Sequence, residues 1–321
     1  MLAKIWHHLF LEERPSVSLS LFRFAVAFTV GAHIIPTFLH LQDNYLSTAF
    51  KEKNFSFFTP KVVALIDKSP DQLVIGMIII FSVSLACFAL GLFSQFSCII
   101  MTLSCYYFYA LNSLHIGTLS YDILLVTLFL MCVTSYHGDS FSLDSILRGD
   151  RESHKRKRPF FLQRLLQLQI ASTYFYTALC KITAGGNWLK DNPLYYLWNS
   201  GPESVVKEFP FRSFFAHRPD LCYFIGLTVM ATELSLPFLL FIVRTRLIGI
   251  FIGFAFHVLL LVTLHVPTIF FFLFPPQLLL FIDPEKIVSL IEKYLRDRGV
   301  SPDPSSLSKP QFFPHGKNWA K

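Results

Sequence analysis

Residues 165–184, LLQLQIASTYFYTALCKITA, form a largely apolar stretch with one cationic side chain, Lys181, near its end. A helix of about 20 apolar residues is long enough to cross the hydrocarbon core of a bilayer. A charge within such a span is costly unless it is paired or lines a wet cavity, so it marks a functional site by default. Alternatively, Lys181 extends along the helix to the nearby interface and has no chemical role. The stretch therefore predicts a membrane helix and provides the first candidate residue.

The polar residues before Lys181 follow a helical repeat. Gln163, Gln167, Tyr174 and Lys181 are spaced by four, seven and seven residues. At about 100° per residue they fall within about 40° of one another, on one face of a helix. We expect that face to contact protein or water and not lipid.

The composition places the whole chain in a membrane. Of its 321 residues, 53% are hydrophobic and 15% are charged, whereas soluble domains carry about 25% charged residues. The net charge of +7 invites a nucleic-acid interpretation, but the basic residues cluster between apolar runs, where they set membrane topology. We therefore expect no nucleic-acid partner. No cleavable signal peptide is evident, because the first apolar run lacks a small-residue cleavage site close behind it.

Eight apolar segments are predicted to span the membrane, separated by proline, glycine, charged or amide residues. They are residues 17–40, 74–93, 96–113, 119–136, 161–183, 222–243, 247–264 and 266–283. Basic residues concentrate in 137–160, at 244–246 and after 283. With an even number of spans and a cytoplasmic N-terminus, all three basic segments fall on the cytoplasmic face, as the positive-inside rule requires. The predicted fold is an all-α polytopic bundle of about eight transmembrane helices in the cell membrane, without a soluble domain.

The chain is predicted to contain one membrane domain, residues 17–283. Residues 1–16 are expected to form an interfacial amphipathic segment, in which Lys4–Leu11 form a short amphipathic helix on the inner interface, and residues 284–321 a short basic cytoplasmic tail. The six cysteines sit singly, mostly inside apolar runs, without zinc or C-x-x-C spacing. We interpret them as small buried hydrophobic residues and expect no metal site.

Polar residues also recur in or beside the other spans. Asn112 and His115 flank the turn before the fourth span, and Asp122 lies within that span. These residues lie at a depth in the membrane similar to that of polar residues on the other helices. We therefore expect an intramembrane cavity that opens outward. Its catalytic candidates are Lys181, His257 and His115, and its lining candidates are Tyr174, Gln167, Glu233, Asp122, Asn112, Trp188 and Arg23.

Several of these residues have a structural alternative. His257 could be a hydrogen-bonded core residue. Glu233 could form a structural ion pair with Arg23 or Lys181, or it could satisfy backbone groups opened by Pro237. Arg23 itself, in the inner half of the first span, fits a structural role better than a chemical one.

Two further alternatives remain open. Asp122 could be a charge at a helix start. Trp188 and the aromatic residues that follow it could form an interfacial belt or a lid over the cavity.

The expected cavity would give Lys181 a chemical role. Desolvation in such a cavity disfavours an ammonium ion, so that a neutral Lys181 could act as a general base.

Three stretches together carry a family likeness. The first is Tyr174–Ile182, YFYTALCKI, with Asn187-Trp188 behind it. The second is Asn112–His115, NSLH, followed by an apolar span that closes with Ser142-Leu143-Asp144. The third is Glu233–Pro237, ELSLP, with Phe256-His257 on the next span. Over residues 15–283 they resemble the horizontally transferred transmembrane (HTTM) family, whose best-known member is the vitamin K-dependent gamma-carboxylase.

The resemblance implies a catalytic lysine at Lys181 and a lipid quinone or quinol as cofactor. Two features differ from the carboxylase. Val258, Leu259 and Leu260 stand where its pattern places an asparagine, and no large lumenal domain follows the last predicted span. In length and domain content the chain is similar to a shorter bacterial branch, the membrane protein of sporulation-delaying killing-factor systems. That likeness implies an exported precursor peptide and a small companion protein as partners.

Three functions are therefore hypotheses. The leading one is an integral membrane protein required for maturation of an exported antimicrobial peptide, with Lys181 and His257 as chemical or gripping groups. The alternative is a quinol-dependent carboxylase or other peptide-modifying enzyme that uses Lys181 as the base. A small-solute transporter is disfavoured, because the broken half-helices and inverted repeats of that class are not visible.

Overall fold

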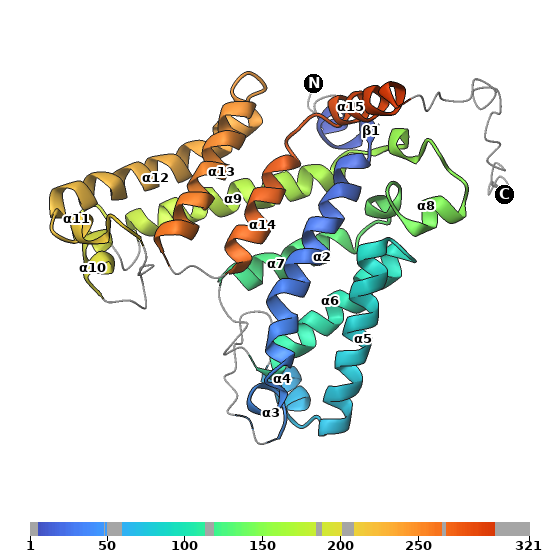
Figure 1. The fold of residues 1–321 in the computed structure, drawn as a ribbon, viewed down its shortest axis with the longest axis horizontal. Coiled ribbons are helices and arrows are strands. Elements are labelled where there is room, and N and C mark those ends of the chain that lie inside the picture. Colours follow the sequence, from blue (N-terminus) through green and yellow to red (C-terminus); the bar gives the residue numbers. More distant parts are fainter. Residues whose placement is uncertain are drawn as a thin grey trace, which may run out of the picture.

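The computed structural model describes residues 6–47, 49, 60–112, 119–183, 188–200, 209–264 and 268–298, which are mostly helical (Figure 1). Helices occupy all eight predicted spans: α2 (Val17–Phe38), α5 (Asp71–Leu90), α6 (Ser94–Leu111), α7 (Leu119–Met131), α9 (Phe161–Thr183), α12 (Pro219–Phe241), α13 (Arg246–Thr263) and α14 (Thr268–Leu279). Within the described residues, α2, α5, α12 and α13 are long and apolar enough to cross a membrane by length and composition. The prediction of an all-α membrane bundle is confirmed.

Two helices are shorter than the sequence predicts. α7 has 13 residues and α14 has 12, so they rise about 20 and 18 Å, less than the ~30 Å of hydrocarbon. After α7 the chain turns into η2 (Tyr136–Gly138), which provides a carbonyl to Arg23. α14 contains Pro275 and Pro276, and its end is followed by Pro284, which has no N–H to continue the helix.

The helices form two groups that meet through α7 and α14 (Figure 1). In one group α5 packs against α2 and α6, and in the other α12 packs against α9 and α13. α14 contacts α2, α9 and α13, and α7 contacts α6, α9 and α14. Short helices cover the far end of each group: α3 (Leu41–Asn44) and α4 (Pro60–Asp67) on the first, α10 (Pro193–Asn199) and α11 (Arg212–Ala216) on the second. The two groups therefore have separate far ends.

The segments that are predicted to be cytoplasmic gather at one end of the bundle. Strand β1 (Glu13–Pro15) pairs antiparallel with β2 (Lys157–Pro159). Helix α15 (Pro284–Asp297) packs against α2 and β1, and its Glu292 forms an ion pair with Lys155 at 2.9 Å. We call this end of the molecule, which is formed by β1, β2 and α15, the basic face.

The turn after α12 also belongs to the basic face. Arg164, at the start of α9, donates a hydrogen bond to the Leu9 carbonyl at 3.3 Å. Its guanidinium lies 5.7 Å from the ring centroid of Phe241, the last residue of α12. The contacts thus place the chain before the first span, the loop before α9 and the turn before α13 together, as an even number of spans requires.

The N-terminal segment has a helical turn within the stretch where the sequence predicts a short helix, and a strand follows it. Residues His7–Leu11 form a single π-helical turn, and Glu13–Pro15 form strand β1. Pairing with β2 satisfies the backbone of residues 13–15, which local hydrophobic periodicity could not indicate, because the partner strand lies more than 140 residues away in sequence.

A buried arginine fixes the basic face to the bundle. Arg23 is 0% exposed, and its two terminal nitrogens donate to the carbonyls of His137 and Phe141 at 2.7 and 2.6 Å. Asp144, in the short helix α8 (Leu143–Leu147) that follows, accepts from the backbone N–H groups of Phe93 and Ser94 and so caps the start of α6. The structure therefore gives Arg23 a structural role and does not place it with Lys181.

The loop around Arg23 is also expected to be sensitive to acid. His137 is fully buried, and burial, assisted by the Arg23 guanidinium, lowers its pKa from the ordinary 6.5 to about 4. The unfolded chain therefore binds a proton on this residue at a higher pH than the folded protein does. Stability should be lost as the pH falls from 6.5 towards 4, by at most about 3 kcal/mol.

This pH dependence can be measured by thermal unfolding of the detergent-solubilised protein between pH 8 and pH 4. The His137→Leu variant should show a flatter pH profile than the unmodified protein, because it has no imidazole to protonate. An unchanged profile in that variant would show that other groups cause the acid sensitivity.

Candidate functional site

The centre of the site is an ion pair between α9 and α12. Lys181 Nζ lies 2.6 Å from both carboxylate oxygens of Glu233. The Glu233 side chain is 7% exposed and that of Lys181 21% exposed, so the pair sits at the edge of the protein interior. Of the two partners that the sequence allows for Glu233, the structure selects Lys181. The opposite charges are in direct contact, which offsets part of the cost of removing each of them from water.

Each residue of the pair lies where its helix ends or is interrupted. Lys181 lies in the last turn of α9, which ends at Thr183. Glu233 precedes Pro237 by four residues in α12, so its carbonyl lacks the N–H that would normally bond it within the helix. The carboxylate itself points to α9 and is engaged by the ammonium ion. The alternative that the Glu233 side chain serves the broken helix is therefore not what the structure shows.

Trp188 covers the ammonium ion. Lys181 Nζ lies 5.4 Å from the Trp188 ring centroid, and the Trp188 backbone N–H donates to the Lys181 carbonyl at 3.1 Å. A Cβ atom at Gly226 would lie 3.5 Å from this indole, so the small residue lets the ring rest against α12. The tryptophan thus provides a cation–π contact on a side that the carboxylate does not occupy.

A second polar pair lies on the same face of α9. The Tyr174 hydroxyl is 2.6 Å from His257 Nε2, and the two residues are 3% and 2% exposed. Tyr174 precedes Lys181 by seven residues, which is about 10 Å along the helix. The two pairs therefore lie along one face of α9, about two helical turns apart.

Aromatic rings enclose His257. Its imidazole stacks on Phe274 with a centroid separation of 5.1 Å and lies 5.7 Å from Phe270. Both phenylalanines come from α14, and the sequence prediction did not include them. Among the described residues, the imidazole therefore has Tyr174 as its hydrogen-bond partner and phenylalanine rings on its other sides.

A glycine face on α13 brings His257 into this wall. Gly249, Gly253 and His257 recur every four residues and are all buried. A Cβ atom at Gly249 would lie 3.0 Å from Leu239 Cβ, and one at Gly253 would lie 2.8 Å from Leu278 Cδ1. Small residues at this spacing let membrane helices approach closely. The Gly-x-x-x-Gly-x-x-x-His spacing is the signal in the sequence that could have predicted this packing.

The part of the polar stripe near the start of α9 has a different partner. The amide nitrogens of Gln163 and Gln167 both donate to the Leu280 carbonyl, at 2.6 and 2.7 Å. That carbonyl has no helical partner because Pro284 stands four residues later. Gln167 also accepts from Arg164 at 2.7 Å. The stripe faces protein as expected, but the structure places Gln167 in this backbone contact and not with Lys181.

Asp122, on α7, and Asn112, at the end of α6, belong to a second set of polar contacts around α6, the second cluster. Asp122 accepts a hydrogen bond from the Tyr109 hydroxyl at 2.8 Å. Asn112 donates to the Asn44 carbonyl at 2.6 Å, and the Asn44 side chain donates in turn to the Thr37 carbonyl at 2.7 Å. Among the described residues no hydrogen bond or ion pair joins Asp122 to Lys181 or Glu233.

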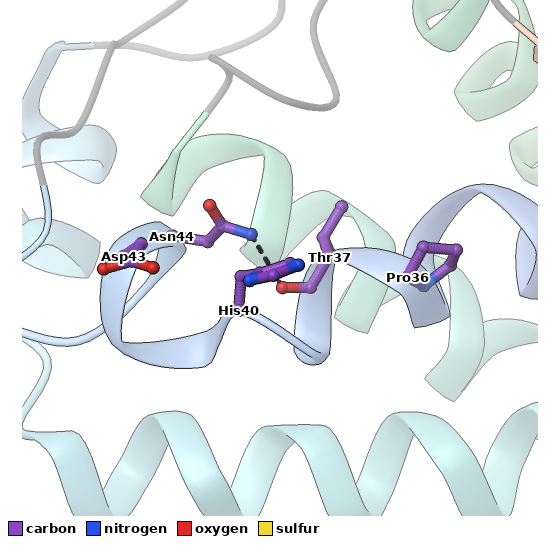
Figure 2. Close-up of a pocket in the computed structure, with 5 residues that line it drawn as sticks. All are labelled: Pro36, Thr37, His40, Asp43 and Asn44. Carbon is purple, nitrogen blue, oxygen red and sulfur yellow. Dashed lines mark hydrogen bonds between the residues drawn. The ribbon is translucent and has the colours of Figure 1, made fainter.

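An open pocket of about 380 Å³ lies beside this second cluster (Figure 2). It is lined by Pro36, Thr37, His40, Asp43 and Asn44. Figure 2 shows the Asn44 amide directed back to the Thr37 backbone, with His40, which precedes α3, and Asp43, within α3, near it. His115, the third catalytic candidate, lies outside the described residues. No group of three or more His, Cys, Asp or Glu side chains in the described part of the chain could hold a metal ion.

Comparison with known proteins identifies the family. The model of the HTTM domain family matches residues 12–285, which include every helix from α2 to α14. Searches among curated proteins and among solved structures each found no match. Because the family match covers most of the sequence, this chain belongs to the HTTM domain family of membrane proteins, which is related to carboxylase-like proteins.

Proposed function

We propose that this membrane protein matures an exported antimicrobial peptide, and that the Lys181–Glu233 pair binds or modifies the peptide. The carrying observation is the pair itself: a lysine and a glutamate from different helices, held at 2.6 Å in a membrane domain. Charges at that depth are expensive, and intramembrane ionisable groups mark functional sites by default. The nearby Tyr174–His257 pair supplies further polar groups for the same site.

The pair can act in two ways on a peptide. As an ion pair, the ammonium ion has a third N–H, which can donate to a peptide carbonyl or carboxylate beside Trp188. In a dry site, transfer of one proton from Lys181 to Glu233 removes both charges and leaves a neutral amine, because desolvation penalises charged forms. That amine is a general base. The same geometry therefore supports either binding of the peptide or abstraction of a proton from it.

The proposed location of the site is the outer end of the bundle in the cell membrane. The basic face is placed in the cytoplasm by the positive-inside rule, with both termini. α9 begins at this face and has 23 residues, so its last turn, with Lys181, lies about 30 Å away. An exported peptide would reach the pair without crossing the bundle.

This orientation predicts a labelling pattern. A cysteine introduced at Lys190, which is exposed after α9, should react with a membrane-impermeant maleimide added to intact cells. A cysteine at Lys293, exposed on α15, should react only after the membrane is permeabilised. The unmodified protein, with its six native cysteines, gives the background. The opposite pattern would place the Lys181 site in the cytoplasm and contradict the proposal.

Aromatic side chains on and beside α10 and α11 provide a surface for the peptide. Tyr196 is 65% exposed, Phe211 59% and Phe214 47%, although they lie next to a packed cluster of Leu194, Trp198 and Cys222. Exposed aromatic residues beside an outward polar site suit a partner that is partly apolar and partly polar. An amphipathic exported peptide has that chemistry.

The proposal is tested by deleting the gene and analysing the exported peptide by mass spectrometry and by a killing assay. We expect the deletion strain to export an inactive precursor, and a plasmid copy of the gene to restore the mature form. A Lys190→Ala copy should restore it equally well, whereas a Lys181→Ala copy should not. Normal toxin activity in the deletion strain would refute the maturation role.

A quinol-dependent modification is the second candidate. It is favoured by the two polar pairs along α9, Tyr174–His257 and Lys181–Glu233, which together offer groups that can accept or donate a proton. Membranes depleted of quinone should then lose the modification and regain it when reduced quinone is added. Full modification in depleted membranes would leave peptide maturation without a quinol as the remaining interpretation.

A further inference from the structure

Two cysteines that are 34 residues apart in sequence meet at one end of α6 and α7. Cys98 Sγ lies 3.7 Å from Cys132 Sγ, and both thiols are free. Cys98 is in the second turn of α6, and Cys132 directly follows the last residue of α7. Two sulfur atoms at this separation are in van der Waals contact. No local pattern indicates the pair, because each cysteine stands alone in its own segment.

A hydroxyl group completes this site. Thr102 Oγ1 lies 3.3 Å from Cys132 Sγ, and it donates to the Cys98 carbonyl at 2.7 Å. The Thr102 side chain therefore holds a position between the two cysteines and can hydrogen-bond the Cys132 sulfur. Among the described residues no third metal-ligating side chain joins them. A two-thiol site is suited to bond formation between the sulfurs.

The two thiols differ in access. Cys98 is 0% exposed, whereas Cys132 is half-buried and its carbonyl accepts from the Gln95 side chain at the surface. In thiol–disulfide exchange one thiolate attacks the oxidant first, and a second thiolate resolves the mixed disulfide. Cys132 is the more accessible thiol, so we assign it the first attack. Cys98 is buried but its sulfur touches that of Cys132, so we assign it the second attack.

We propose that Cys98 and Cys132 form a reversible disulfide by exchange with a small disulfide such as oxidised glutathione. The Cys132 thiolate attacks one sulfur of the oxidant, and one glutathione leaves as its thiolate. The Cys98 thiolate then attacks the Cys132 sulfur and releases the second glutathione. The two protons lost by the cysteines end on the two glutathione thiols, and the two electrons reduce the oxidant. Formation of the bond brings the two sulfur atoms from 3.7 Å to about 2.05 Å.

The disulfide would link α6 to the turn that follows α7. This turn leads directly into the loop that Arg23 and Asp144 fix to the start of α6. Oxidation would therefore lock the basic end of the α6–α7 pair. In a reducing cytoplasm the thiols remain free, and oxidising conditions would close the bond.

The test uses the full-length protein in membrane vesicles treated with oxidised glutathione, then denatured and alkylated. Of the six thiols, four should remain reactive, and peptide mapping should recover one cross-link between the Cys98 and Cys132 peptides. Dithiothreitol should restore all six. Six reactive thiols after oxidation, or a cross-link to Cys105, would overturn the proposal.

Variants separate the two steps. Cys98→Ala should trap Cys132 as the mixed disulfide with glutathione, whereas Cys132→Ala should leave Cys98 unmodified because it is buried. Cys180→Ala, which changes a half-buried cysteine on α9, is the matched control and should form the same cross-link as the unmodified protein. Modification of Cys98 in the Cys132→Ala variant would overturn the order of attack. If a variant fails to fold, the peptide map of the unmodified protein still decides the outcome.

Discussion

Replacing Lys181 with methionine is expected to abolish maturation of the exported peptide and to destabilise the protein by about 3–5 kcal/mol. The stability loss arises because the nearly buried Glu233 carboxylate would keep its charge without a partner. Loss of maturation is expected because the site would retain neither an ammonium donor nor an amine base. Thermal unfolding in detergent measures the first effect, and mass spectrometry of the exported peptide measures the second.

A double variant separates the two effects. Lys181→Met combined with Glu233→Leu removes both charges, and replacing a buried ion pair with apolar residues is often neutral or stabilising. We therefore expect the double variant to unfold close to the temperature of the unmodified protein and still to lack maturation activity. Lys190→Ala, on the exposed segment after α9, should change neither property. Full activity in both Lys181→Ala and Lys181→Arg variants would remove Lys181 from the chemistry.

Replacing Gly91 with alanine is expected to be among the most destabilising single changes at the basic face. Gly91 ends α5 with φ of +68°, a left-handed conformation that costs other residues roughly 1–2 kcal/mol. A Cβ atom there would also clash with Ser142 Cβ and lie 2.7 Å from Arg23 Nη1. The buried guanidinium cannot move without losing its carbonyl partners at His137 and Phe141. The total loss should exceed about 3 kcal/mol.

Two other glycines are matched controls for Gly91. Gly149 has φ of +67° and open space within 4 Å of the position that a Cβ would take, so Gly149→Ala should show only the conformational cost of about 1 kcal/mol. Gly76 lies inside α5 with open space around it, so Gly76→Ala should be neutral or stabilising. The three unfolding temperatures should rank Gly91→Ala lowest and Gly76→Ala highest. Equal values for Gly91→Ala and Gly149→Ala would show that the Arg23 contact contributes little.

Much of the fold was predictable, since hydrophobic runs and punctuation are local signals. All eight predicted spans contain helices, and the grouping of basic segments at one end agrees with an even number of spans. The features that local signals did not indicate lie where distant segments pair. The N-terminal segment forms a strand with Lys157–Pro159, and the predicted end of the fourth span instead turns to meet Arg23.

The candidate site was predicted in part. The spacing on α9 indicated that Lys181 and Tyr174 share a face, and the structure adds that this face meets α12 and α13. Asp122 shows the limit of such reasoning, because similar depth does not determine which residues pair. It lies on α7 and bonds to Tyr109.

Composition and helical period were sufficient to establish that this protein is a helical membrane bundle and that one stripe of α9 must face away from lipid. The packed fold was needed to show that Glu233 pairs with Lys181, that the glutamines of the stripe serve a carbonyl freed by Pro284, and that Cys98 meets Cys132. These pairings depend on the crossing and axial register of helices, which are set by close packing at positions such as Gly249 and Gly253. No local pattern encodes that register.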